Sequence, residues 1–257
     1  ASMPDNVARG MERASAVIIL NDRVTGRPVA VMEGSIISKQ RTAASAALAS
    51  RVLAQGEPNT IGFVGCGPIN TSVAQFLTTV WPNTGRLVAF DLDSARAETF
   101  GVELLTRRPG LDFHVAANLQ ELLKECSMVS FGTTAIKPYV DDLEASPAGA
   151  TILHVSLRDL TADVVLSNHN IVDDLDHVNR AATSIHLASE QAGHTNFVHS
   201  SLGDLLLGKT KLPQRDGRKF IFSPFGLGVL DLAVADLVLN TVADEGDGVL
   251  VKSFLPA

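Results

Sequence analysis

The stretch that most constrains the fold of this chain is residues 60–77, TIGFVGCGPINTSVAQFL. It begins as a short apolar run, passes through Gly-Cys-Gly-Pro, and then carries an apolar residue at every third or fourth position. This pattern predicts a buried strand, a tight glycine turn and an amphipathic helix. In a dinucleotide-binding βαβ unit, the first glycine permits the turn and the second lets a pyrophosphate approach the helix N-terminus. Gly65 and Gly67 fit these two roles.

The residues around this turn extend the prediction of a nucleotide site. We expect Pro68, Ile69 and Asn70 to complete the cofactor-binding loop, although Asn70 occupies the third position of G-x-G-x-x-G, where a small residue normally allows close packing. Asp91 ends the next apolar run, where a carboxylate accepts hydrogen bonds from the adenosine ribose. A carboxylate at this position repels a 2′-phosphate and so favours NAD over NADP, whereas the nearby Arg96 favours NADP.

Short apolar runs alternate with helical patterns from Thr60 onward. This alternation is typical of a parallel sheet that is covered on both faces by helices. The sequence therefore predicts an α/β fold, a doubly wound parallel sheet of Rossmann type, over residues 55–226. Strands are expected at 60–65, 86–91, 112–116, 127–132, 150–156, 170–174 and 219–224, and helices at 68–80, 94–107 and 118–125.

The two ends of the chain have a different pattern. Two β-rich runs within residues 15–34 bracket Val24-Thr25-Gly26 and predict a hairpin, which a helix at 35–54 follows with Ser35 as its N-cap. An apolar helix at 226–243 and a strand at 248–254 are expected near the other end. We assign residues 1–54 and 227–257 together to a second, smaller α+β domain for substrate binding and dimerisation.

Composition limits the class of partner. The chain has 257 residues, 46% hydrophobic and 19% charged, with no run of 18 apolar residues and no apolar centre of a secretory signal near its start. Its net charge of −7 and the lack of a dense Lys/Arg block argue against nucleic acid. We therefore expect a cytoplasmic protein with a small-molecule partner, no membrane contact and no nucleic acid.

Cys66 and Cys126 lack C-x-x-C spacing and are interpreted as buried apolar residues.

Two further groups of polar residues follow expected strands. Thr133 and Thr134 come after the fourth strand of the series, where loops line the ligand crevice, so they are candidates for contacting the nicotinamide half of the cofactor; ordinary turn chemistry before Pro138 is the alternative. Asp173, Asp174, Asp176 and His177 include metal-binding side chains. A strand that ends in a polar loop is the simpler interpretation of this second group, and we assign no metal.

Four segments of the chain resemble the ornithine cyclodeaminase and μ-crystallin family. They are MERASAVIILND at 11–22, AVMEGSIISKQRTAASAALASRVLA at 30–54, GFVGCGPI at 62–69 and SPFGLGVLDLAVADLV at 223–238. The first of these is most similar to the NAD-dependent dehydrogenases of 2,3-diaminopropionate biosynthesis, which supply a siderophore or antibiotic precursor. The resemblance implies NAD as cofactor and oxidation of an adduct of diaminopropionate and glutamate, with release of the diamino acid and 2-oxoglutarate.

The resemblance also implies roles for individual residues. Arg41 and Thr42 fall on the substrate-carboxylate arginine of the family and its neighbour, and a guanidinium fork suits a carboxylate. Asp159 matches the catalytic aspartate, a group able to handle protons after hydride has left. Without the resemblance, Arg41 would be interpreted as part of a solvated or salt-bridged helix face, and Asp159 as a helix N-terminal aspartate. Further cofactor contacts are implied at Ser156, Ser223 and Gly226, and Asp231 matches the acidic residue of the following helix.

Other activities remain compatible with this sequence. The family also implies a segment before the position of Ala1, with a substrate-binding lysine, so we expect the N-terminal part of the smaller domain to be missing here. The enzymatic alternatives are an ornithine cyclodeaminase, which recycles its hydride, and a ketimine reductase that runs in the opposite direction. A third alternative is a protein that binds nucleotide and a small molecule without turnover. A homodimer through the smaller domain is expected, because its apolar hairpin has no evident partner in a Rossmann unit.

Overall fold

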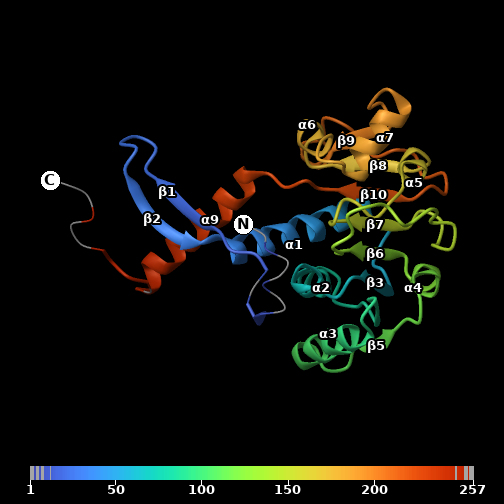
Figure 1. The fold of residues 1–257 in the computed structure, drawn as a ribbon, viewed down its shortest axis with the longest axis horizontal. Coiled ribbons are helices and arrows are strands. Elements are labelled where there is room, and N and C mark those ends of the chain that lie inside the picture. Colours follow the sequence, from blue (N-terminus) through green and yellow to red (C-terminus); the bar gives the residue numbers. More distant parts are fainter. Residues whose placement is uncertain are drawn as a thin grey trace. The chain divides into compact units, whose positions relative to one another are not determined.

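The computed structural model describes residues 3, 6, 9–11, 13–246, 248–251 and 254. The chain divides into two compact units, one made of residues 1–41 and 227–257 and the other of residues 42–226 (Figure 1). The first boundary lies inside helix α1 (Gly34–Leu53), before the predicted boundary at residue 55. The physical reason is that α1 from Ala43 onward is buried in the core of the larger unit.

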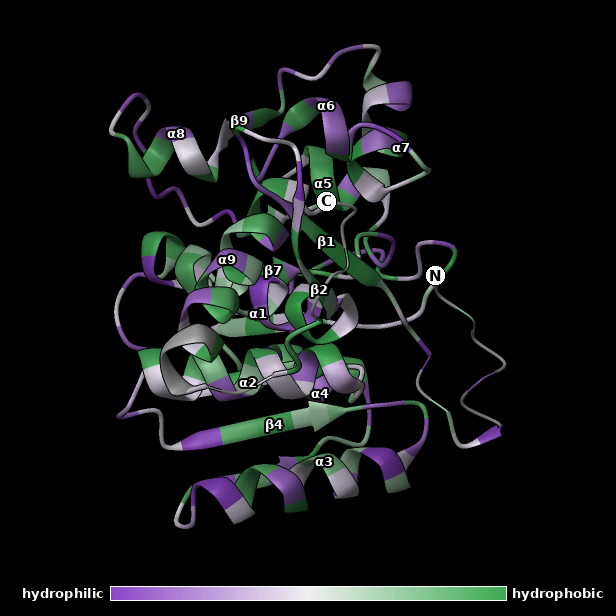
Figure 2. Ribbon diagram, turned by 90° about the vertical axis from the view of Figure 1, so that its left-hand side faces the viewer, coloured by the Kyte–Doolittle hydropathy of each residue, from purple (hydrophilic) through white to green (hydrophobic). Residues whose placement is uncertain are grey.

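The smaller unit contains the predicted hairpin. Strands β1 (Val17–Asn21) and β2 (Pro28–Glu33) pair antiparallel, with Ile18 opposite Met32, and hydrophobic residues dominate β1 (Figure 2). One face of the hairpin packs on α1 and α9 (Gly228–Glu245) through a small core around Leu20, Ile37 and Ala235.

Two local predictions for this unit are wrong. Ser35 does not cap α1, because the Glu33 carboxylate accepts the amide hydrogens of Ser35 at 2.9 Å and Ile36 at 3.1 Å instead. The expected strand at 248–254 is absent from its described residues, 248–251 and 254, since the described sheet of this unit contains only β1 and β2. Residues 252 and 253 lie outside the described residues.

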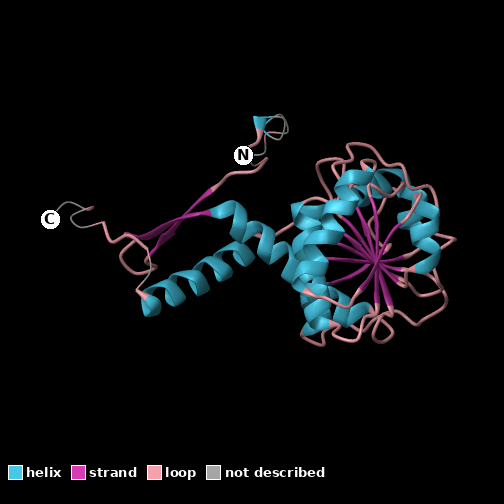
Figure 3. Cartoon of the chain, turned by 90° about the horizontal axis from the view of Figure 1, so that it is seen from below, coloured by secondary structure: helices cyan, strands magenta, loops and turns pink. Residues whose placement is uncertain are grey.

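An eight-stranded parallel sheet forms the centre of the larger unit, so the predicted α/β fold is confirmed. Its strand order is β5-β4-β3-β6-β7-β10-β8-β9, and helices cover both faces (Figure 3). The strands are β3 (Thr60–Val64), β4 (Arg86–Phe90), β5 (Asp112–Val115), β6 (Met128–Phe131), β7 (Thr151–His154), β8 (His169–Val172), β9 (Val198–Ser201) and β10 (Phe220–Ser223). The helices are α2 (Pro68–Val80), α3 (Ser94–Arg107), α4 (Leu119–Glu125), α5 (Ala162–Leu166), α6 (Leu175–Val178), α7 (Ser184–Ala192) and α8 (Leu202–Leu206).

The strand order reverses between β3 and β6. From β3 the chain proceeds outward through β4 and β5, then returns to the other side of β3 as β6 and continues through β7. In open parallel sheets, ligands bind beyond the carboxyl ends of the strands at such a reversal. The fold therefore places the loops that follow Val64 and Phe131 together, where a nucleotide site is expected.

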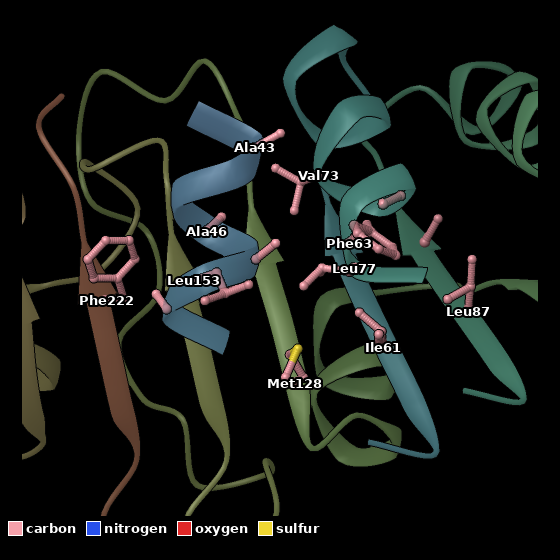
Figure 4. Packing of buried hydrophobic residues seen from close by; sticks show 14 of the residues in the cluster. Ala43, Ala46, Ile61, Phe63, Val73, Leu77, Leu87, Met128, Leu153 and Phe222 are labelled. Carbon is pink, nitrogen blue, oxygen red and sulfur yellow. The ribbon is translucent and has the colours of Figure 1, made fainter. Parts of the chain in front are cut away.

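Two apolar cores hold the sheet between its helices. On one face, the small side chains Ala43 and Ala46 of α1 let this helix lie close to the strands, beside Val73 and Leu77 of α2 (Figure 4). On the other face, α4, α5 and α7 contribute a separate cluster. Alternation along the strands explains the division, because Ile61 and Phe63 belong to the first core and Val64 to the second.

The segment between β8 and β10 differs most from the sequence prediction. It contains α6, α7, α8 and the edge strand β9, none of which was expected. Strand β9 reads Val-His-Ser-Ser and pairs with β8 alone, so it carries no buried apolar run to identify it. None of the helices in the described residues combines the length and hydropathy that a membrane crossing needs.

Candidate nucleotide and catalytic site

The glycine turn after β3 is shaped by both of its glycines. Gly65 has φ +83°, and a Cβ at this position would lie 2.7 Å from the carbonyl oxygen of Gly132 in the loop after β6. Gly67 is the N-cap of α2, with Pro68 as the first helical residue, and a Cβ there would meet nothing within 4 Å. The turn thus needs Gly65 for its own conformation, whereas Gly67 leaves open space before a helix N-terminus. This is the arrangement that binds phosphate.

Asn70 supports the turn from inside the protein. Its side chain is fully buried, and Nδ2 donates hydrogen bonds to the carbonyl oxygens of Val64 at 3.0 Å and Gly65 at 2.7 Å. Its Oδ1 accepts a hydrogen bond of 2.7 Å from Ser130 Oγ on β6. A Cβ on Gly132 would lie only 2.6 Å from Asn70 Cγ. The small residue that close packing requires is therefore on the partner loop, and the buried side chain of Asn70 holds the turn. A contact of Asn70 with the cofactor stays a prediction.

Asp91 lies at the carboxyl end of β4, beside the glycine turn. Its Oδ2 accepts a 2.8 Å hydrogen bond from the backbone amide of Cys66, and its Oδ1 accepts a 3.0 Å hydrogen bond from the backbone amide of Asp93. The carboxylate is partly buried and is held next to the loop that would receive the pyrophosphate. This position fits contact with the adenosine ribose.

The Asp159 side chain is the centre of a buried hydrogen-bonded cluster after β7. It has no exposed surface, and its Oδ1 accepts a short hydrogen bond from Thr133 Oγ1 in the loop after β6. Its Oδ2 accepts a short hydrogen bond from Ser156 Oγ and lies 3.2 Å from His154 Nε2. Thr133 and Ser156 are half-buried, so direct contact between a ligand and the carboxylate requires one of these hydroxyls to rotate away.

Hydrogen bonding decides the charge of Asp159. Burial by itself raises the pKa of this carboxyl, but hydrogen bonds from His154, Ser156 and Thr133 outweigh burial and place the pKa below its ordinary value. Burial and the negative charge of Asp159 raise the pKa of the adjacent Tyr139 phenol. At neutral pH the site therefore holds an ionised Asp159 beside a protonated Tyr139.

Two residues beside Asp159 were not expected from the sequence, the buried His154 and the 44% exposed Tyr139. His154 is fully buried at the end of β7, and its Nδ1 lies 3.2 Å from Ser223 Oγ of β10. A histidine at the last position of an otherwise apolar strand was the available signal. The predicted residues Thr133, Ser156, Asp159 and Ser223 do come together at the carboxyl edge of β6, β7 and β10.

The other predicted cofactor-binding residues lie in the loops at the carboxyl edge of the sheet or at the start of α2. Pro68 and Ile69 are exposed at the start of α2, and Thr134 is exposed beside Thr133. The amide of Gly226, which has φ +101°, donates a 2.6 Å hydrogen bond to Asp173 Oδ2. Asp173 thus fixes the loop after β10.

Two groups of metal-binding side chains have other functions in the structure. In the cluster found in the sequence, Asp173 holds a loop and Asp174 caps α6, accepting a 2.9 Å hydrogen bond from the His177 amide. Within the described residues, the donor atoms of His114, Glu121 and Glu125 lie within 4.8 Å of one another. This group is already engaged, because Glu121 Oε1 lies 2.9 Å from His114 Nε2 and Glu125 pairs with Arg86. We assign no metal.

Arg41, the predicted substrate-binding arginine, lies in the smaller unit. Its Nε donates a 2.9 Å hydrogen bond to Asp231 Oδ1 of α9, and its Nη2 lies 3.3 Å from Ser38 Oγ. The ion pair is partly buried, with 14% of the Arg41 side chain and 24% of the Asp231 side chain exposed. Asp231 thus orients the guanidinium through its Nε edge. Thr42 follows Arg41 in α1 as the first residue of the larger unit.

Known proteins that resemble this chain include a family and several dehydrogenases. The model of the ornithine cyclodeaminase/mu-crystallin family matches residues 1–246. N-((2S)-2-amino-2-carboxyethyl)-L-glutamate dehydrogenase of Staphylococcus aureus is 29% identical over 248 residues, which are 96% of this chain and 74% of that protein. An archaeal alanine dehydrogenase dimer solved with bound NAD is 27% identical, with a TM-score of 0.88 over 98% of this chain and 79% of its own.

A third protein shares the fold at lower sequence identity. Delta(1)-pyrroline-2-carboxylate reductase of Thermococcus litoralis, solved with NADH and L-proline, has a TM-score of 0.90. The match covers 97% of this chain and 78% of that one at 24% identity. At this identity the likeness concerns the fold alone.

Proposed function

Because this chain belongs to the ornithine cyclodeaminase/mu-crystallin family, we propose that it is an NAD-dependent oxidoreductase that acts on the carbon–nitrogen bond of an amino-acid derivative. The observation that carries the proposal is the open helix N-terminus at Gly67, with Asp91 beside it, at the strand reversal of the sheet. Gly65, Gly67 and the α2 amides would bind the pyrophosphate, and Asp91 the adenosine ribose. Bound NAD would accept a hydride from the substrate carbon.

The proposed substrate is an N-(1-amino-1-carboxy-2-ethyl)glutamate-type adduct. Support comes from the Staphylococcus aureus relative, whose name specifies this class of compound. Loss of hydride from the glutamate α-carbon leaves an iminium ion. Attack by water then breaks the carbon–nitrogen bond and releases 2,3-diaminopropionate, 2-oxoglutarate and a proton. Supply of a siderophore precursor is the corresponding biological role.

Asp159 has the charge that this reaction needs. The lowered pKa of its carboxyl makes it a weak base at neutral pH, so its main contribution would be electrostatic. An ionised carboxylate stabilises the positive charge that develops on the carbon–nitrogen unit as hydride leaves. Thr133 and Ser156 are half-buried and donate hydrogen bonds to this carboxylate, so their polarised hydroxyl oxygens would extend its negative potential to a bound substrate.

The proposal is tested by following NADH absorbance with the synthetic adduct as substrate. Alanine, ornithine, and pyrroline-2-carboxylate with NADH serve as alternatives in the same assay. Turnover of the adduct with release of 2-oxoglutarate is expected. Turnover of another compound instead would contradict the substrate assignment, and NAD binding without turnover of any of them would favour a non-catalytic binding protein.

Asp91 is expected to give NAD a clear advantage over NADP. Its carboxylate lies next to the Cys66 amide, where a 2′-phosphate would meet like charge, and desolvated like charges cost several kcal/mol, on the order of a hundredfold in affinity. Isothermal titration calorimetry with both dinucleotides measures the preference. Asp91→Ser should reduce it, and Arg96→Ala, which removes the nearby cation, should increase it. Equal affinities in the unmodified protein would contradict the prediction.

Arg41 is proposed to bind a substrate carboxylate through the terminal edge of its guanidinium. Arg41→Ala should raise KM by an amount equivalent to about 2–5 kcal/mol of binding, because the substrate charge loses its partner. NAD affinity should change little. Asp231→Asn is the matched control, since its amide oxygen still accepts from Arg41 Nε and keeps the side chain in place. Steady-state kinetics that show an unchanged KM in Arg41→Ala would assign Arg41 to the ion pair alone.

A homodimer through the hairpin is proposed as well. The hairpin face away from the small core exposes Val17, Ile19, Val29 and Val31, each by more than half. A contiguous apolar surface of this kind is typical of a subunit interface, and the archaeal relative is a dimer. Light scattering at micromolar concentration should give twice the chain mass, and Ile19→Lys combined with Val31→Lys should give the monomer. A monomeric parent protein would contradict the proposal.

The expected cytoplasmic location stays a prediction.

A further inference from the structure

His154 is a buried titratable side chain to which the proposed reaction gives no role. It is the last residue of β7 and has no exposed surface. Its ring meets Phe131 edge to face, with centroids 6.3 Å apart, so apolar packing fixes the plane of the imidazole. Nδ1 lies 3.2 Å from Ser223 Oγ, and Nε2 lies 3.2 Å from Asp159 Oδ2. The ring therefore connects the end of β10 with the carboxylate.

The position of the imidazole proton decides what this contact does. Nε2 lies 3.2 Å from the backbone nitrogen of Asp159 as well as from its Oδ2. With a proton on Nε2, the ring donates to the carboxylate and Nδ1 accepts from the Ser223 hydroxyl. With the proton on Nδ1, the ring donates to Ser223, and Nε2 accepts the Asp159 amide hydrogen while its lone pair faces a carboxylate oxygen.

Physical chemistry favours the first arrangement. A hydrogen bond to a carboxylate is roughly twice as strong as one between neutral groups. The second arrangement also places a lone pair against a negative oxygen inside a low-dielectric interior, where such repulsion is strong. The first arrangement leaves the Asp159 amide, whose hydrogen points toward Nε2, without this acceptor, and the charge-assisted bond to the carboxylate outweighs this loss.

We propose that His154 is a positioning residue that donates its Nε2 proton to Asp159, with Ser223 fixing its tautomer, and so keeps this carboxylate ionised and oriented. The inference rests on the proposed role of Asp159 in the reaction. It is based on three side chains that contact one another in a row at one edge of the sheet: Ser223 at the end of β10, His154 at the end of β7 and Asp159 in the loop after β7. His154 is among the groups that lower the pKa of Asp159.

Two titratable groups act on Asp159 from the neighbouring elements. His154 belongs to β7, and Tyr139 belongs to the segment after β6, where burial and the charge of Asp159 raise the pKa of its phenol. The hydroxyls of Thr133 and Ser156 supply the other hydrogen bonds. A change in the titration of Asp159 on replacement of His154 therefore reports the loss of the imidazole donor.

The tautomer can be measured in the unmodified protein. Nitrogen-15 NMR of labelled histidine distinguishes Nδ1–H from Nε2–H, and the signal of His154 is identified by its loss in His154→Gln. We expect a proton on Nε2, and a shift of the Nε2 signal in Asp159→Asn. The Nδ1–H form in the unmodified protein would overturn the inference, and this result does not depend on whether any variant folds.

Carbon-13 NMR of labelled aspartate gives the titration of Asp159, with Asp159→Asn as the blank. Loss of a donor to the ionised form raises a carboxyl pKa, so His154→Leu should raise it by about one pH unit or more. His154→Gln should restore about half of the difference through its amide donor, and Ser223→Ala should give a smaller rise. An unchanged titration in a folded His154→Leu protein would overturn the inference.

His169 supplies the matched control. It is also a buried histidine bonded to a carboxylate, with Nε2 3.0 Å from Asp216 Oδ1, but it begins β8 at the opposite end of the strands. His169→Gln should leave the Asp159 titration unchanged. If Asp159→Asn keeps its turnover, the proposed reaction role of Asp159 fails, whereas the tautomer and the titration still decide whether His154 controls its charge.

Discussion

Replacing Asp159 with asparagine is expected to lower kcat by roughly 10²–10³-fold while KM changes little. The carboxylate is ionised because three donors stabilise its charge, and an amide of the same shape carries no charge to stabilise an iminium ion. Steady-state kinetics with the synthetic adduct measure the effect. Turnover within a few-fold of the parent protein would contradict the assignment of Asp159 to the reaction.

The same variant has a predictable dependence of stability on pH. A carboxyl whose pKa is lower in the folded than in the unfolded protein stabilises the fold above the unfolded value of about 3.9, and this contribution disappears as the pH falls through the folded value. The pKa of Asp159 is lowered in the fold. Asp159→Asn should therefore be less stable than the parent near neutral pH, with a difference that shrinks on acidification. Urea unfolding at several pH values measures the difference and shows whether the variant is still folded where its kcat is measured.

Gly65→Ala is expected to destabilise the protein by about 3 kcal/mol or more. An alanine in the left-handed conformation costs about 1–2 kcal/mol. Its Cβ would also lie 2.7 Å from the Gly132 carbonyl oxygen, a backbone atom that moves only with its loop. Overpacking of this kind adds about 1–3 kcal/mol. The melting temperature should fall by roughly 6–12 °C, and NAD affinity should fall with it.

Gly67→Ala separates the two effects of the glycine turn. Its φ of −88° suits any residue, and a Cβ there has no neighbour within 4 Å, so stability should change by no more than about 0.5 kcal/mol. NAD affinity should nevertheless fall about tenfold or more, because the new methyl group stands where a phosphate would approach the α2 amides. Calorimetric titration and thermal unfolding of the two variants distinguish a folding glycine from a binding glycine. Unchanged NAD affinity in Gly67→Ala would place the pyrophosphate elsewhere.

Local sequence patterns were sufficient to predict most of the larger unit. The alternation of apolar runs and helical patterns from Thr60 predicted the parallel sheet, because a strand that is buried on both faces must be continuously apolar. The same reasoning failed for β9, which pairs on one side only and is polar. The prediction of Ser35 as N-cap failed because α1 begins at Gly34, and the Glu33 carboxylate accepts the amide hydrogens of Ser35 and Ile36.

The sequence by itself determined the glycine turn, the place of Asp91 after the next strand and the alternation of strands and helices, because these depend on residues close together in the chain. Tertiary structure decided the rest of the site. Asn70, an exception to the expected motif, proved to pack against Gly132, a residue 62 positions later that belongs to the neighbouring loop. Likewise, the charge of Asp159 depends on Thr133, Ser156 and His154, and the orientation of His154 depends on Ser223. Hydrogen bonds and close contacts act over a few ångströms, and only the folded sheet brings these distant residues within that range.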